Sequence, residues 1–190
     1  MTGPAGGLRP VSISARPAFY PGPVTLAACA QAAGFSQKVL QPPVTDVKGT
    51  RWTPSGLQVI LAIAGAESSG NAWAFNHNAD GSTDCGVWQI NTIHSQWFDG
   101  SNPVVSPFNP WDAAVMAFEL HKAAAWGFTP WAAYSGPAHH WLGYRDSALE
   151  GGRGESWLEW AQHGIAGLNA LLAQGQTLRD IASVTEDEAP

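Results

Sequence analysis

Apolar residues recur every three or four positions in three stretches of the chain, which is the spacing of one face of an α-helix. The inward-facing residues that this spacing predicts are Leu57, Ile60, Leu61 and Ala64 in the first stretch, Trp111, Ala114, Val115 and Phe118 in the second, and Trp157, Trp160, Ile165 and Leu168 in the third. The pattern therefore predicts three amphipathic helices that share a core.

Capping residues indicate where the helices begin and end. Thr53 and Pro54 are a cap and a first residue for the first helix, and Asn109-Pro110 has the same form for the second, which we expect Gly127 to end. Shorter helices are predicted over 24–33, 130–134 and 139–149, with Gly34 ending the first of these, and a loop is predicted over 41–53.

A polar segment interrupts the helical pattern between residues 74 and 91. The run Asn76 to Asp84 is typical of a small β-hairpin, with Asp80-Gly81 at its turn. The predicted fold class is α+β, mainly α, with one small hairpin between helices.

Composition divides the chain into four predicted parts. Five prolines and four glycines in 1–23 indicate an extended arm, and 24–150 should form the main domain. A C-terminal helix over 151–175 should pack on or beside that domain, and 176–190 reads as an acidic tail.

The overall charge excludes some partners. Fifteen acids against nine bases give a net charge of −6, so the chain has no general attraction for nucleic acid. The longest apolar stretch, Leu57–Ala66, is too short to span a membrane, and the first residues lack the pattern of a signal peptide. Cys29 and Cys85 are too few for a disulfide framework, although they could pair.

Two carboxyl groups in contrasting settings carry the candidate chemistry. Glu67 continues the apolar face of its helix near the C-terminus, whereas Asp84 lies seventeen residues later in the polar hairpin. An apolar setting raises the pKa of one carboxyl while a hydrated setting keeps the other ionised, as cleavage of a glycosidic bond requires. The alternative is a surface glutamate at a helix end and an aspartate in a turn.

The run from Glu67 to Asn91 resembles the active-site segment of c-type lysozymes. That family has the acid, an Asn-rich hairpin with Asp-Gly-Ser-Thr-Asp, and Gly-x-x-Gln-Ile-Asn in the same order, and no gap is needed here. About 25 residues match closely, and the wider similarity covers roughly 55–145. The eight cysteines of the animal enzymes are absent, as are the adjacent tryptophans that follow the hairpin; here His94 and Ser95 stand there, with Trp97 beyond.

The same segments are similar to bacterial and phage lytic transglycosylases of the SLT type. Their pattern of Glu-Ser, Gly-Leu-x-Gln and Ala-Tyr-Asn-Ala-Gly has counterparts in Glu67-Ser68, in 86–89 and in 133–136. Ser135 replaces the asparagine and the last loop is shorter, which weakens that motif. Both resemblances imply a lysozyme-like fold and a peptidoglycan glycan substrate.

The resemblance also implies roles for individual residues. Glu67 would be the general acid at the bond between N-acetylmuramic acid and N-acetylglucosamine, and Trp131 would shield it from water. Asp84 would be the nucleophile or charge stabiliser of a retaining hydrolase, or would only order the hairpin in a transglycosylase that forms 1,6-anhydro products. Sugar contacts are expected from Asn78, Gln89, Asn91, Trp97, Trp131 and Tyr134.

Several alternatives remain open. Tyr134 could bond Glu67 or the substrate, or pack between helices, and His139-His140 read as solvated surface rather than as zinc ligands. We expect no metal site and no cofactor. The chain could instead be a non-catalytic peptidoglycan-binding component. With its arm and tail, it could also be carried by phage tail proteins, and a virion (tail) location with delivery to the cell wall is the expectation.

Overall fold

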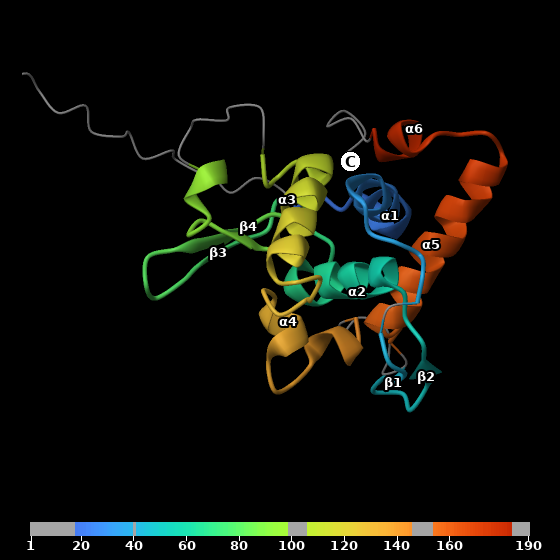
Figure 1. Cartoon of the computed structure of the whole chain (residues 1–190), viewed down its shortest axis with the longest axis horizontal. Helices are drawn as coiled ribbons and strands as arrows, with labels where there is room; N and C mark the ends of the chain where they lie inside the picture. Colours follow the sequence, from blue (N-terminus) through green and yellow to red (C-terminus); the bar gives the residue numbers. More distant parts are fainter. Residues whose placement is uncertain (1–17, 40, 99–105, 146–153, 184–190) are drawn as a thin grey trace, which may run out of the picture.

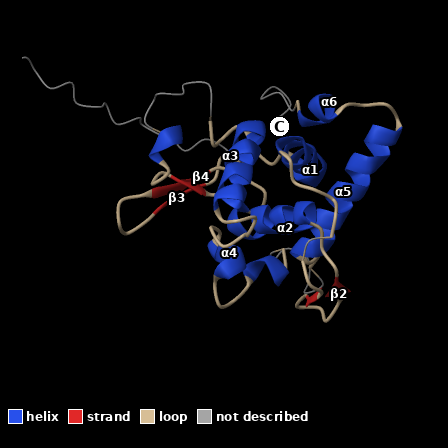
Figure 2. Ribbon diagram, viewed as in Figure 1, coloured by secondary structure: helices blue, strands red, loops and turns tan. Residues whose placement is uncertain are grey.

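The computed structural model describes residues 18–39, 41–98, 106–145 and 154–183, and everything below concerns these residues. Helices dominate, and the strands are short (Figures 1 and 2). The elements in order are α1 Gly22–Ala33, β1 Val44–Thr45, β2 Arg51–Trp52, α2 Gly56–Ser68, β3 Phe75–His77, β4 Thr83–Cys85, β5 Ile90–Asn91, the 3-10 turn η1 Ser95–Trp97, α3 Pro110–Ala123, α4 Ala132–Ser135, the 3-10 turn η2 His140–Leu142, α5 Trp157–Ala173 and α6 Leu178–Ala182. The mainly α class with some β is confirmed.

Helix α2 forms the centre of the fold. It packs against α1, α5, α4 and η2 (Figure 1). Every residue from Gly56 to Gly65 is buried. The predicted inner stripe is therefore only part of its buried surface, because neighbours surround this helix on all sides. Gly65 permits the closest approach, since a Cβ there would lie 2.3 Å from the ring of Trp157 on α5.

Several predicted helix ends are confirmed and others are wrong. Asn109 caps α3 and accepts hydrogen bonds from two N–H groups of its first turn, and Gly34 ends α1 at a φ of 123°. The cap of α2 is Ser55, not Thr53, because the Ser55 hydroxyl accepts the Gln58 N–H. The predicted stop at Gly127 is also wrong: α3 ends at Ala123, and the left-handed residues are Ala125 and Trp126.

The inward face of α3 differs from the prediction. Ala114 is buried as predicted and Phe118 is half-buried, but Trp111 and Val115 are exposed. The other buried residues of the helix are Ala113, Met116, Ala117, Leu120 and His121. Helix α3 packs closely on α1, and its buried face combines alanines with larger side chains such as Met116 and Leu120.

Two other segments depart from the prediction, and a short helix forms within a third. The expected loop over 41–53 contains the hairpin β1–β2, and Asp46 holds its turn by accepting the Lys48 N–H, the Thr50 N–H and the Trp52 indole N–H. The expected helix over 139–149 is only η2, followed by extended Gly143, and 146–149 lie outside the described residues. The stretch 176–190 contains α6, with Ile181 buried.

The first residues of the described fold contact the rest of the domain. Phe19, near the end of the predicted arm, is buried, and its carbonyl oxygen accepts the Ala72 N–H; residues 1–17 lie outside the described range.

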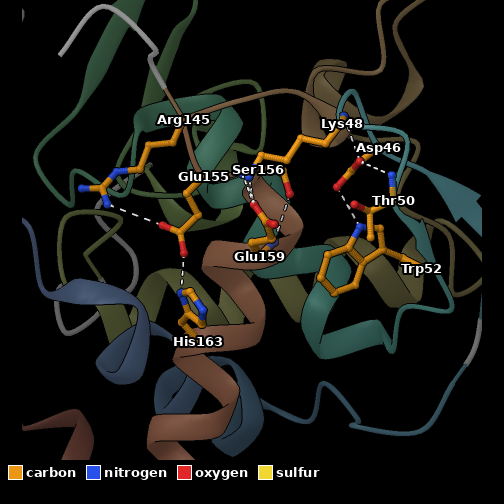
Figure 3. Close-up of polar contacts among 9 residues, drawn as sticks. All are labelled: Asp46, Lys48, Thr50, Trp52, Arg145, Glu155, Ser156, Glu159 and His163. Atoms are coloured by element: carbon orange, nitrogen blue, oxygen red, sulfur yellow. Dashed lines mark hydrogen bonds and ion pairs between the residues drawn. The ribbon is translucent and has the colours of Figure 1, made fainter. Parts of the chain in front are cut away.

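The capping box of Ser156 and Glu159 begins α5, and Lys48 pairs with Glu159 at 2.6 Å (Figure 3).

Both cysteines are free and buried, on different elements of the fold. Cys29 lies in α1 and Cys85 in β4. Burial raises the pKa of the Cys29 thiol to about 12 and that of Cys85 to about 11, with the charge of Asp84 adding to the latter. The structure therefore contains no bridge between them.

Candidate active site

Glu67 lies in the last turn of α2, where the helix leaves the core. Its side chain is partly buried, and its Oε1 accepts a hydrogen bond of 2.9 Å from the backbone N–H of Ala133 in α4. That N–H belongs to the first turn of α4 and has no partner within the helix. The carboxyl group is thus held between two helices that are far apart in the sequence.

The surroundings of Glu67 raise its pKa above the ordinary value of a glutamate. Burial is the main cause, and the negative charge of Asp84 acts in the same direction. The Ala133 N–H and the charge of His140 oppose them without reversing the shift. A carboxyl group with a raised pKa keeps its proton to higher pH, which is what a general acid needs.

Asp84 lies in β4, at the centre of the three-stranded antiparallel sheet β3–β4–β5. Register places it opposite Asn76 on one side and Asn91 on the other. Its Oδ2 accepts the Asn78 amide at 3.0 Å and its Oδ1 accepts the Asn91 amide at 2.6 Å. Both oxygens are therefore oriented by amide donors of neighbouring hairpin residues.

The hairpin that carries these groups forms as predicted. The Asn78 N–H donates to the Ser82 carbonyl across the turn, and Gly81 takes a φ of 86°. The Ser82 hydroxyl accepts from the amides of Asn78 and Asn91. Asn78 and Asn91 thus lie beside Asp84, whereas their expected contacts with sugars remain a prediction.

The turn between β4 and β5 follows the Gly-Val-Trp-Gln motif. Gly86 has a φ of 74°, and a Cβ there would lie 1.7 Å from the carbonyl oxygen of Pro107, so this position requires glycine. The Gln89 amide donates to the carbonyls of Gly86 and Ala74. The side chain of Gln89 therefore stabilises this turn. The sugar contact expected from Gln89 remains a prediction.

Ser68 connects the acid's helix to that turn. Its hydroxyl lies 2.8 Å from the carbonyl oxygen of Val87 and accepts the Gly70 N–H. This role of Ser68 is not among the predictions, although the Glu-Ser pair of the transglycosylase motif is a signal for it. The serine sets the position of the hairpin relative to Glu67.

Trp88 and Trp131 connect α2, the turn between β4 and β5 and the start of α4 through hydrogen bonds of their indole N–H groups. Trp131 is buried, and its indole N–H donates to the carbonyl of Trp88 at 2.9 Å; the Trp88 indole N–H donates to the carbonyl of Ile60 in α2 at 3.0 Å. Trp131 also precedes α4 directly, two residues before the Ala133 N–H. It therefore orients the helix that contacts Glu67, while its predicted role as a water shield is untested.

Tyr134 and Trp97 are the two remaining residues that were expected to contact sugars. The Tyr134 hydroxyl lies 3.1 Å from Oε1 of Gln41, and its ring stacks on Trp141 at 5.3 Å, so the packing alternative describes its contacts. Trp97 is half-buried in η1, 5.7 Å from the His94 ring. The contact of these residues with a substrate remains a prediction.

Sequence reasoning missed two groups that act on Glu67. The Ala133 N–H could not be anticipated because a backbone donor leaves no trace in residue type. His140, which we read as solvated surface, is indeed exposed, yet its charge reaches Glu67 and lowers the pKa. Among the described residues, no three His, Cys, Asp or Glu side chains come together as a metal site, and no helix could span a bilayer.

Comparison with known proteins identifies a family for the central part of the chain. Residues 47–133 match the family model described as a lysozyme-like domain, a range that includes Glu67, Asp84 and Ala133. No curated protein and no solved structure matches the chain. Residues 47–133 thus form a lysozyme-like domain, which supports degradation of peptidoglycan by a muramidase or a lytic transglycosylase.

Proposed function

We propose that the protein is a muramidase that cleaves the β-1,4 bond between N-acetylmuramic acid and N-acetylglucosamine. The observation that carries the proposal is the contrast between its two carboxyl groups. Glu67 is partly buried with a raised pKa, and Asp84 is a carboxylate whose two oxygens accept amide hydrogen bonds.

In this mechanism Glu67 donates its proton to the oxygen of the glycosidic bond. As the bond breaks, positive charge develops on the sugar, and the Asp84 carboxylate stabilises that charge or forms a covalent bond with the sugar carbon. Water then attacks that carbon, and Glu67, now ionised, accepts the proton of the water. The Ala133 N–H stabilises the ionised Glu67 between the two steps.

A lytic transglycosylase is the second candidate, since Asp84 need not react in it. Both of its oxygens already accept hydrogen bonds from Asn78 and Asn91, as expected for a residue that orders the hairpin. In that reaction the 6-hydroxyl of the muramic acid attacks in place of water. Glu67 is then the only carboxyl group that the chemistry needs.

Muropeptide mass spectrometry distinguishes the two candidates. Purified peptidoglycan is digested with the wild type, with Glu67→Gln and with Asp84→Asn. Reducing-end muramic acid products that disappear in both variants support the muramidase. Products lighter by one water that persist in Asp84→Asn support the transglycosylase, and a wild type that releases no product would point to a binding component.

For location, we propose that a phage particle carries the protein in its tail and delivers it to the cell wall. The net charge of −6 supports carriage, because an acidic enzyme has no electrostatic attraction to anionic cell walls. Proteomics of purified particles tests the idea. Finding the protein in the lysate while the particles lack it would exclude carriage by the virion.

A further inference from the structure

Trp126 is the most exposed of the ten tryptophans, with 61% of its surface in solvent. It follows the C-terminal end of α3, and this end of the helix is directed toward α4 (Figure 1). An indole ring in water loses the free energy that burial would provide, so this position is unfavourable for folding alone.

The backbone at this position is also strained. Ala125 has a φ of 52° and Trp126 a φ of 66°, both in the left-handed region that glycine occupies without cost. Gly127 stands one residue later and does not take either of these conformations. Strain in a non-glycine residue persists only where the surroundings fix it, and it is concentrated at functional sites.

The surroundings do fix this turn. The Trp126 N–H donates to the His121 carbonyl at 2.9 Å, and the Gly127 N–H donates to the Ala124 carbonyl at 3.0 Å. A ring nitrogen of His121, which is buried, lies 3.0 Å from the Gly127 carbonyl oxygen. Three contacts within one turn hold the backbone that carries the exposed indole.

Two aromatic rings contact the indole ring of Trp126. The Phe118 ring lies 6.0 Å away at 63° and the His121 ring 5.7 Å away at 79°, so both meet it edge to face. The rest of the indole is in solvent. A large, rigid and partly solvent-exposed aromatic surface is suited to stacking against the apolar face of a sugar ring, because little conformational entropy is lost on binding.

Aromatic contacts connect this surface to the candidate active site. His121 stacks on Phe128 at 4.5 Å, and Phe128 contacts Trp131 at 6.3 Å. Trp131 directly precedes α4, whose Ala133 N–H holds Glu67. The position of Trp126 is therefore fixed relative to the acid by packed rings and not only by the intervening chain.

We propose that Trp126 is a stacking platform for a sugar of the glycan strand, at a distance from the bond that is cleaved. The inference rests on the proposed function, since it takes peptidoglycan glycan as the ligand. Its consequence is a dependence on strand length. A strand long enough to cover Trp126 gains affinity that a disaccharide does not.

Calorimetry on protein carrying Glu67→Gln tests this without turnover. The ligands are peptide-free strands of alternating N-acetylglucosamine and N-acetylmuramic acid with two, four and six sugars. We expect Trp126→Ala to weaken six-sugar binding roughly five- to tenfold and to leave two-sugar binding unchanged. Trp126→Tyr should restore most of the affinity. Trp111→Ala, which removes an exposed tryptophan at the other end of α3, is the matched control.

The outcomes separate the two proposals. Equal affinity for the six-sugar strand with and without the Trp126 side chain overturns the platform and leaves the proposed function standing. A Trp126→Ala variant that changes only the self-association of the protein has the same meaning. A protein that binds no strand of any length removes the proposed function as well. Should Trp126→Ala not fold, the indole N–H signal of Trp126 in the Glu67→Gln protein must shift with six sugars and not with two.

Discussion

The backbone N–H of Ala133 donates a 2.9 Å hydrogen bond to Oε1 of Glu67 across 66 residues of sequence. The contact couples the C-terminus of α2 to the N-terminus of α4. It stabilises the ionised form of a carboxyl group whose burial favours the protonated form. The two effects on the pKa of Glu67 therefore oppose each other, and burial prevails.

Replacing Glu67 by glutamine should remove activity while keeping the fold. We expect the rate of muropeptide release to fall by about 10²- to 10⁴-fold, the usual contribution of a positioned acid. The glutamine carbonyl can still accept the Ala133 N–H, so the site geometry is retained. Ser69→Ala, at the exposed residue that follows the helix, is a control that should keep activity.

The same variant should change the pH dependence of stability. Because the pKa of Glu67 is raised in the folded state, its contribution to stability is present below the unfolded pKa and is lost as pH rises through the folded pKa. Glu67→Gln should therefore raise the unfolding midpoint in urea at pH 7 more than at pH 3. Equal gains at both pH values would contradict the raised pKa.

The charges near Glu67 should shift its titration in opposite directions. Asp84→Asn removes a negative charge and should lower the pKa of Glu67, whereas His140→Gln removes a positive charge and should raise it. NMR titration of the Glu67 side-chain carboxyl carbon measures both without needing activity. His163→Gln, on α5, is the control and should leave the titration unchanged.

Two glycines of the hairpin region should respond differently to alanine. Both have positive φ, but a Cβ at Gly86 would meet the Pro107 carbonyl, whereas a Cβ at Gly81 would meet nothing within 4 Å. We expect Gly81→Ala to cost about 1 kcal/mol of unfolding free energy and Gly86→Ala about 2–4 kcal/mol. Chemical denaturation measures both, and similar costs would show that the close approach to Pro107 does not limit this turn.

Asp46 should stabilise the protein at neutral pH and not in acid. Burial tends to raise its pKa, but hydrogen bonds from the Trp52 indole, the Thr50 N–H, the Ser156 hydroxyl and the Lys48 N–H outweigh burial and lower it (Figure 3). The stability it gives is present above the unfolded pKa and is lost as pH falls through the folded pKa. Asp46→Ala should cost about 2 kcal/mol at pH 7 and clearly less at pH 2, with Asp46→Asn intermediate.

The sequence could predict features that depend on local chemistry. The Asn109 cap, the Gly34 stop and the hairpin around Gly81 all follow from what a few neighbouring residues can bond or which φ they tolerate. Motif spacing likewise selected Glu67 and Asp84, and the structure brings their charges within reach of each other.

Features that depend on distant packing could not be predicted in the same way. The pattern placed Trp111 and Val115 inside because they are large and apolar, yet α3, which packs on α1, buries Ala113, Met116 and Ala117 and exposes both of them. The action of Ala133 and His140 on Glu67 depends on where α4 and η2 dock. Neither position is encoded in local periodicity.

The unpaired state of Cys29 and Cys85 has a consequence for how the chain can be produced. No covalent cross-link holds the described fold, and both thiols are buried with raised pKa values, so they react slowly with oxidants. Folding then needs neither an oxidising compartment nor an isomerase for disulfides. The yield of native protein should be the same in the presence and absence of a reductant.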